Sequence, residues 1–194
     1  MSMNPQLFWE GEGDRQGRFS EWSNTLTEAD AHSFYAAEAY LQAGDPIGSS
    51  GELNSISPAN QIQPGFLTLR WRAFAKAEEW RGAYEVAEVF SQVVPHMPEP
   101  WLLLAEAAWH IADMGPMKAI GILAEILPNF HHEPVIPFTL ACYNCGLGRL
   151  EEAHGWWMAA LCIAKRQGTD KEWKRKALEE PGLQPLWSAD SLVA

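Results

Sequence analysis

The sequence predicts an all-α fold, a stack of antiparallel helix-turn-helix hairpins, and three observations carry this prediction. From residue 27 onward, helix-length apolar patterns alternate with short breaks that contain Gly or Pro. No segment shows the alternation of apolar and polar residues that is typical of a half-buried strand. Apolar positions also recur with a period near 34 residues. Short connections between consecutive helices favour antiparallel neighbours.

The elements follow in order along the chain. Residues 1–26 show neither a helical nor a strand period, so we expect a flexible leader before a helical domain at 27–194. The predicted hairpins span about 30–57, 64–94, 99–127 and 134–166, and a C-terminal cap spans 170–194. The cap begins with a mostly charged helix, after which Leu183, Leu186 and Trp187 are expected to fold back over the last hairpin.

The four hairpins can be aligned with one another, and we call this alignment of equivalent positions the repeat frame. Small residues mark where helices touch in a stack of hairpins, and bulky residues fill the gaps between them. In the first helix of each hairpin the frame aligns Ala37, Trp71, Ala105 and Ala141, with steps of 34, 34 and 36 residues. In the second helix it aligns Ser49, Ala83, Ala119 and Ala153. The period therefore indicates a helical repeat.

These residues resemble the tetratricopeptide repeat family, over roughly residues 30–167. The last hairpin matches the family pattern best, at Leu140, Ala141, Gly148, Leu150, Ala153, Trp157 and Ala160. The second and third hairpins match in part, at Trp80, Ala83, Pro95, Trp101, Leu104 and Ala105. The resemblance implies a superhelical solenoid that binds another protein or a peptide.

Two features depart from the family pattern. The second helix of the first hairpin contains Gly48 and Gly51, and each glycine costs about 1 kcal/mol against Ala in a helix interior. We therefore expect a short or frayed helix there. Trp71 stands where a small residue is usual, and we expect it to push the helices apart or to redirect their packing.

In the resembled family, the first helix of each hairpin lines a concave groove that receives an extended peptide or a partner helix. The groove-facing positions carried over to this chain are Arg72, Lys76, Leu102, Glu106, Trp109, His110, Phe138 and Cys142. The basic pair Arg72 and Lys76 precedes apolar residues around Trp109. Such a surface suits a ligand that carries an acid or a terminal carboxylate beside a hydrophobic anchor.

Composition limits the class of partner. The formal net charge of -11 opposes binding to nucleic acid and to anionic membranes, and it favours a basic partner segment. The first residues form no signal peptide, and no stretch reaches the ~18 apolar residues of a membrane helix. Three cysteines do not suggest a disulfide framework. We therefore expect a cytoplasmic protein with reduced thiols.

The sequence offers little for catalysis or for cofactor binding. Cys142 and Cys145 form a Cys-x-x-Cys pair, but both lie inside a predicted helix, where small core or groove-wall residues are a better interpretation than a zinc site. No phosphate-binding loop, zinc-protease motif or nucleophile elbow is present. We expect a protein that is not an enzyme and that uses no metal or cofactor.

Two alternatives to an adaptor stay open. One is a small secretion-type chaperone that masks a hydrophobic segment of its partner. The other is a structural module that forms homo-oligomers through its ends or through a swapped leader. The leader carries aromatic residues among acids, so it is either a disordered end or a segment that occupies the groove of its own or a neighbouring chain. Its aromatic residues are Phe8, Trp9, Phe19 and Trp22.

Overall fold

A computed structural model describes residues 26–188 of the chain, and within these residues it contains helices and no strand. The predicted all-α fold is therefore confirmed for the described part. The predicted leader, up to residue 25, and the end of the predicted cap, from residue 189, lie outside the described residues. The described residues pack into two compact units that divide between Ala119 and Ile120. We call them the N-terminal unit (26–119) and the C-terminal unit (120–188), and each is described by itself.

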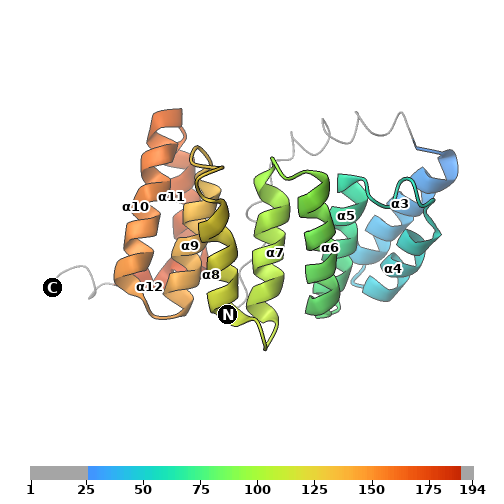
Figure 1. Cartoon of the computed structure of the whole chain (residues 1–194), viewed down its shortest axis with the longest axis horizontal. Helices are drawn as coiled ribbons and strands as arrows, with labels where there is room; N and C mark the ends of the chain where they lie inside the picture. Colours follow the sequence, from blue (N-terminus) through green and yellow to red (C-terminus); the bar gives the residue numbers. More distant parts are fainter. Residues whose placement is uncertain (1–25, 189–194) are drawn as a thin grey trace. The chain divides into compact units, whose positions relative to one another are not determined.

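The N-terminal unit consists of helices that alternate in direction and lie side by side (Figure 1). They are α3 (Glu28–Gln42), α4 (Pro46–Ser55), α5 (Pro64–Lys76), α6 (Trp80–Val93) and α7 (Pro98–His110), followed by the start of α8 (Gly115–Ile126). The helices α3 and α4 form one hairpin, and α5 and α6 form the next. Because each connection is short and reverses the chain, the first helices α3, α5 and α7 run parallel to one another.

Local sequence signals begin these helices. Thr27 caps α3 with its hydroxyl oxygen, which accepts from the Asp30 N–H at 3.1 Å, and Asp45 caps α4 by accepting from the Gly48 N–H at 2.9 Å. The helices α4, α5 and α7 each start with a proline at one of their first two positions, where the missing N–H would have no helical partner.

The turns inside two hairpins use glycine in the left-handed region, Gly44 with φ 83° and Gly148 with φ 73°. The equivalent turn between α5 and α6 instead places Glu78 at φ 59°. A side chain in this region costs free energy that glycine does not, because its Cβ approaches the backbone. The second hairpin therefore carries local strain at Glu78.

The second helix of the first hairpin does form, although its glycines count against it. It is α4, and at 10 residues it is short, as expected, beside the 15 residues of α3. A Cβ at Gly48 would lie 2.6 Å from the ring of Tyr40 and from the carboxylate of Asp45, whereas a Cβ at Gly51 would meet nothing within 4 Å. Gly48 thus lets α3 and α4 approach closely, at the expense of helix propensity.

Burial supports the repeat frame. Residues aligned in the first helices are at most 1% exposed: Ala37, Trp71, Ala105 and Ala141. Those aligned in the second helices are all 0% exposed: Ser49, Ala83, Ala119 and Ala153. The period read from the sequence therefore marks the positions where neighbouring helices touch.

Trp71 is accommodated by an aromatic neighbour. Its ring meets that of Trp80 edge-on, with centroids 6.5 Å apart and planes at 63°. The Trp71 Nε1–H is buried and has no hydrogen-bond acceptor among the described residues. An unsatisfied buried donor costs about 1–3 kcal/mol, so the large residue fills space here at the expense of one polar contact.

The C-terminal unit contains the end of α8, the hairpin of α9 and α10, and the segment that follows it. The remaining elements are α9 (Val135–Gly146), α10 (Leu150–Gln167), α11 (Asp170–Glu179), a 3-10 turn η1 (Pro181–Leu183) and α12 (Gln184–Trp187). Leu183 and Leu186 are buried in one cluster with residues of α9 and α10, and Trp187 packs edge-on against Trp157 at 6.0 Å. The expected fold-back over the last hairpin is therefore present up to residue 188.

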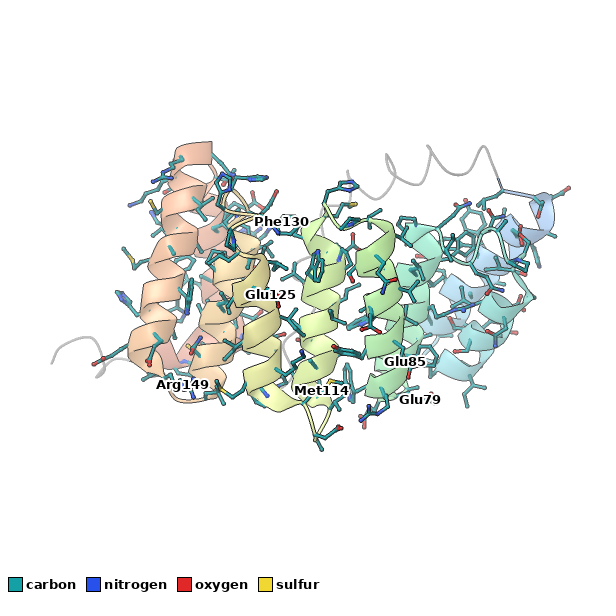
Figure 2. The ribbon with its side chains drawn as sticks, in the orientation of Figure 1. Glu79, Glu85, Met114, Glu125, Phe130 and Arg149 are labelled. Atoms are coloured by element: carbon teal, nitrogen blue, oxygen red, sulfur yellow. The ribbon has the colours of Figure 1, made fainter. Side chains whose placement is uncertain are left out.

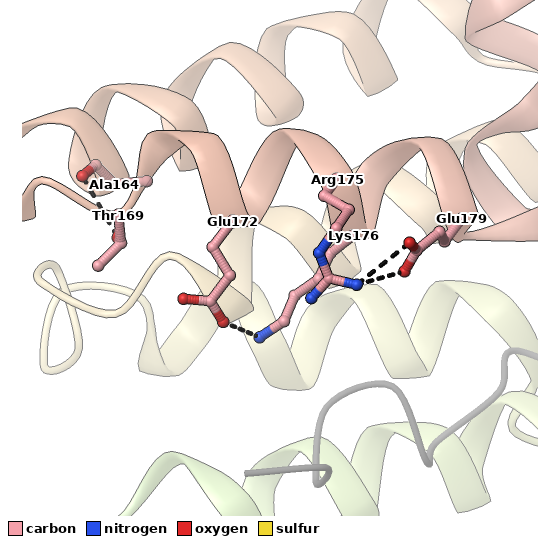
Figure 3. A network of polar contacts seen from close by, with 6 residues as sticks. All are labelled: Ala164, Thr169, Glu172, Arg175, Lys176 and Glu179. Carbon is pink, nitrogen blue, oxygen red and sulfur yellow. Dashed lines mark hydrogen bonds and ion pairs between the residues drawn. The ribbon is translucent and has the colours of Figure 1, made fainter.

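Ion pairs lie along α11 (Figure 3). Lys176 lies 2.8 Å from Glu172, and Arg175 lies 2.9 Å from Glu179, each pair one helical turn apart. At the start of the helix, the Thr169 hydroxyl donates to the Ala164 carbonyl of α10 at 3.3 Å. Exposed pairs of this spacing contribute about 0.3–0.5 kcal/mol each to the stability of a helix. They therefore add little to the stability of α11.

Candidate protein-interaction site

Two of the predicted groove residues, Phe138 and Cys142, lie in the core of the C-terminal unit. The Phe138 ring is 2% exposed and packs edge-on against Trp173 of α11 at 5.3 Å. Cys142 is 3% exposed, and its Cβ lies 3.4 Å from where a Cβ on Gly182 of η1 would be. Because α11 and η1 pack over them, no ligand reaches these side chains unless the C-terminal segment moves.

The Cys-x-x-Cys pair has the surroundings of core residues. Cys142 and Cys145 are both buried in α9 and belong to the same apolar cluster. Burial raises the pKa of the Cys145 thiol to about 11, so this sulfur stays protonated near neutral pH and is neither a nucleophile nor a ready metal ligand. Within residues 26–188, no group of three or more His, Cys, Asp or Glu side chains is placed to hold a metal ion.

The other six predicted residues lie together in the N-terminal unit, on neighbouring faces of α5 and α7. A hydrogen bond joins the two faces: the Thr68 hydroxyl of α5 donates to Glu99 of α7 at 3.1 Å. Residues one and two turns after Thr68 are Arg72 and Lys76, and residues one to three turns after Glu99 are Leu102, Glu106, Trp109 and His110. We call these six residues, with Thr68 and Glu99, the α5/α7 face.

Side chains on the α5 part of this face reach solvent to different degrees. Arg72 is half-buried and Lys76 is exposed. The two cations stand out from an acidic unit, because residues 26–119 contain five Lys and Arg against twelve Asp and Glu. Acids are exposed at the start of α6, such as Glu79 at its N-cap and Glu85 within the helix (Figure 2). The α5 part of the face is therefore a small basic patch formed by Arg72 and Lys76.

The α7 part of the face combines apolar and polar groups. Leu102 is buried, and Trp109 is half-buried near the end of the helix. Glu106 is only 6% exposed, and its Oε1 lies 3.2 Å from Nε2 of His110, one turn later. The His110 ring in turn stacks on Trp80 with centroids 3.9 Å apart and planes at 14°. These contacts hold the side chains of α7 in defined positions beside Trp109.

Sequence reasoning gave Trp80 and Glu99 no place in this arrangement. Trp80 is visible in the sequence as a repeat position, but nothing there shows that its ring stacks on a histidine 30 residues later. Glu99 pairs with Thr68 across a separation of 31 residues. No short-range pattern signals either contact, because both depend on how neighbouring hairpins pack.

No helix of the described residues is long and apolar enough to cross a membrane.

Comparisons with known proteins show the type of fold. No protein-family model matches the chain, and no curated protein matches it. The solved structure titled "MamA RS-1 ArsTM double mutant" aligns with a TM-score of 0.58 and 14% identity over 85% of this chain and 92% of that chain. "MamA MSR-1 C2" aligns with a TM-score of 0.55 and 15% identity over 79% and 91% of the two chains. A third structure, "Crystal structure of MamA", aligns with a TM-score of 0.52 and 12% identity over 78% of this chain and 92% of that chain.

At this level of identity the likeness shows the fold alone. The chain has the all-helical repeat fold of these structures, of the tetratricopeptide-like type. The predicted fold class is thereby confirmed, whereas no family model and no curated relative shows membership of the tetratricopeptide repeat family.

Proposed function

We propose that this protein is a non-enzymatic interaction scaffold that binds a peptide or a partner helix on the α5/α7 face. The observation that carries the proposal is the basic patch of Arg72 and Lys76 on α5 beside Trp109 on α7. The hydrogen bond from Thr68 to Glu99 joins these two helices. The shared fold supports it, because helical repeats present extended surfaces for partners.

Each part of the face has a separate task in this proposal. The indole of Trp109 offers a large apolar area for a hydrophobic side chain of the ligand, and aromatic residues dominate the energetics of many interfaces. Arg72 and Lys76 attract a carboxylate and set the direction of the ligand along the helices. The contacts of His110 with Glu106 and Trp80 hold α7 rigid, which lowers the entropy lost on binding.

A peptide-display screen against the full chain tests the proposal. Selected peptides are expected to carry a hydrophobic residue near an acid or a free carboxylate. Peptides that are uniformly basic and lack apolar residues would contradict the ligand class. The selected peptide is then labelled and its affinity measured by fluorescence anisotropy.

Substitutions locate the binding site. Trp109→Ala is expected to weaken binding about 30-fold, which corresponds to loss of an anchor residue worth about 2 kcal/mol. Lys76→Glu is expected to weaken it several-fold, more at low salt than at high salt. Lys171→Glu in the C-terminal unit is a control, since it makes the same charge change at another exposed position. Equal affinities for all three variants would place the ligand elsewhere.

A further inference from the structure

The chain itself contains a segment with the chemistry that the α5/α7 face is proposed to bind. Residues 7–14 read Leu-Phe-Trp-Glu-Gly-Glu-Gly-Asp, so an aromatic pair is followed by three acids at alternating positions. The glycines between the acids leave the backbone free to adopt an extended shape. This segment precedes the described residues.

The segment and the α5 part of the face carry opposite charges. The segment carries Glu10, Glu12 and Asp14 and no basic residue, whereas the α5 part of the face carries Arg72 and Lys76. Most of the N-terminal unit would repel such a segment, because its acids outnumber its bases twelve to five. The basic patch of Arg72 and Lys76 is therefore the favourable place on this unit for an acidic segment.

The length of the leader allows the contact. Trp9 precedes Leu26, the first described residue, by 17 residues, and a flexible chain of that length spans about 20–25 Å on average. The α7 helix lies two first helices from α3, because α3 contacts α5 through Phe34 and Phe66 at 5.0 Å and α5 contacts α7 through Thr68. With helix separations of about 10 Å, and Trp109 one helix length along, the span is about 25 Å.

We propose that residues 7–14 dock on the α5/α7 face of their own chain and act as a built-in competitor of the external partner. The aromatic pair takes the place of the ligand's hydrophobic anchor beside Trp109, and the acids lie along Arg72 and Lys76. This inference rests on the proposed function of the face and adds a regulatory element to it. A partner then binds only by displacing the segment.

The expected strength of the competition follows from the tether. A short flexible linker gives an effective concentration on the order of 1 mM. If the isolated segment binds with a dissociation constant near 10 µM, a value typical of short peptides, the tethered copy weakens a competing ligand about 100-fold. Disabling the segment therefore exposes the site without any change in the face itself.

The test compares full-length chains. A labelled peptide of residues 5–16 is titrated into the wild type and into a variant with Phe8→Ala and Trp9→Ala. The peptide is expected to bind the variant about 100-fold more tightly than the wild type, and Lys76→Glu added to the variant reduces this affinity. A second variant with Phe19→Ala and Trp22→Ala removes two leader aromatics outside the segment and is expected to behave like the wild type.

Other results overturn the inference in distinguishable ways. Equal affinity of the peptide for the wild type and for the Phe8→Ala, Trp9→Ala variant shows that the segment does not occupy the face. If the display-selected peptide binds through Trp109 while the leader peptide binds neither chain, this inference fails and the proposed function stands. If neither peptide depends on Trp109 or Lys76, the proposed function fails as well.

A crosslinking measurement separates docking within one chain from exchange between two copies. A photoreactive phenylalanine analogue at position 9 is expected to crosslink to α5 or α7 within one chain, with a yield independent of protein concentration. Crosslinked dimers whose yield rises with concentration would instead identify a second copy as the acceptor and would refute docking in cis.

Discussion

Replacing Asp30 by asparagine tests the polar cluster that ties the start of α3 to the loop between α4 and α5. The carboxylate of Asp30 is buried, with Oδ1 accepting from the Ser57 N–H at 2.7 Å. Its Oδ2 accepts from the Ser57 hydroxyl and from Nδ2 of Asn60, both at 2.7 Å. The side chain thus joins residues about 30 positions apart, in a loop without regular structure.

The magnitude follows from the bonds that the change removes. The asparagine side chain of the variant keeps one oxygen for the Ser57 N–H, but its NH₂ group then faces the NH₂ group of Asn60, so one charge-assisted bond is lost and the others weaken. Hydrogen bonds to charged groups contribute about 1.5–3 kcal/mol each. We expect Asp30→Asn to lower the free energy of unfolding by about 2–3 kcal/mol, or Tm by about 4–12 °C.

The pH dependence gives a sharper signature than the size. The Ser57 N–H, the Ser57 hydroxyl and Asn60 together lower the pKa of Asp30 from 3.8 to about 2, against the opposing effect of burial. The unfolded chain binds this proton at a higher pH than the folded chain does. The stabilisation by Asp30 is therefore complete above pH ~5 and is lost progressively as the pH falls towards 2.

The assay is urea unfolding followed by circular dichroism, for the wild type and for Asp30→Asn, at several pH values from about 7 to about 2.5. The difference between the two chains is expected to shrink below pH ~4. Asp45→Asn is the control, because Asp45 is exposed and Asn caps a helix about as well as Asp. A difference for Asp30→Asn that is below about 0.5 kcal/mol at pH 7, or that does not change with pH, would refute this reasoning.

Three further outcomes follow from single positions. Gly48→Ala is expected to destabilise the chain by about 1–3 kcal/mol through overpacking, whereas Gly51→Ala is expected to stabilise it by up to about 1 kcal/mol. Equal urea midpoints for the two variants would contradict the close approach of α3 and α4. Glu78→Gly is expected to raise stability by about 1 kcal/mol because its φ is positive, and a loss in Tm would refute the strain at this turn. In thiol titration of the native chain, Cys162 is expected to react fast and Cys145 only after unfolding. Fast reaction of the remaining thiols in a Cys162→Ala chain would contradict the burial of α9.

The sequence was sufficient to predict the parts of the fold that repeat. Small residues such as Ala83, Ala119 and Ala153 recur at nearly constant spacing, and each is fully buried. Such positions are readable because every hairpin solves the same packing problem with the same residue type. The first hairpin was harder to assess, because helix propensity counted against Gly48, while the contact that favours a glycine there lies with another helix.

Contacts between helices also limit what the sequence says about the candidate site. The resemblance to the tetratricopeptide repeat implied groove positions at Arg72, Lys76 and Trp109, which lie on α5 and α7. It also implied Phe138, but the C-terminal segment folds back and packs Trp173 against its ring. A repeat pattern describes each unit as if its neighbours were alike, so it is blind to the capping segment that has no equivalent.

By itself, then, the sequence determined the all-helical class, the repeat period and the residues at which helices touch, because these depend on spacing within and between similar units. Only the tertiary structure decided which side chains meet across hairpins, as Asp30 meets Ser57 and Trp80 meets His110, and that Phe138 is covered. These contacts join residues that are distant along the chain, and their existence depends on the detailed packing of helices, which no local pattern encodes.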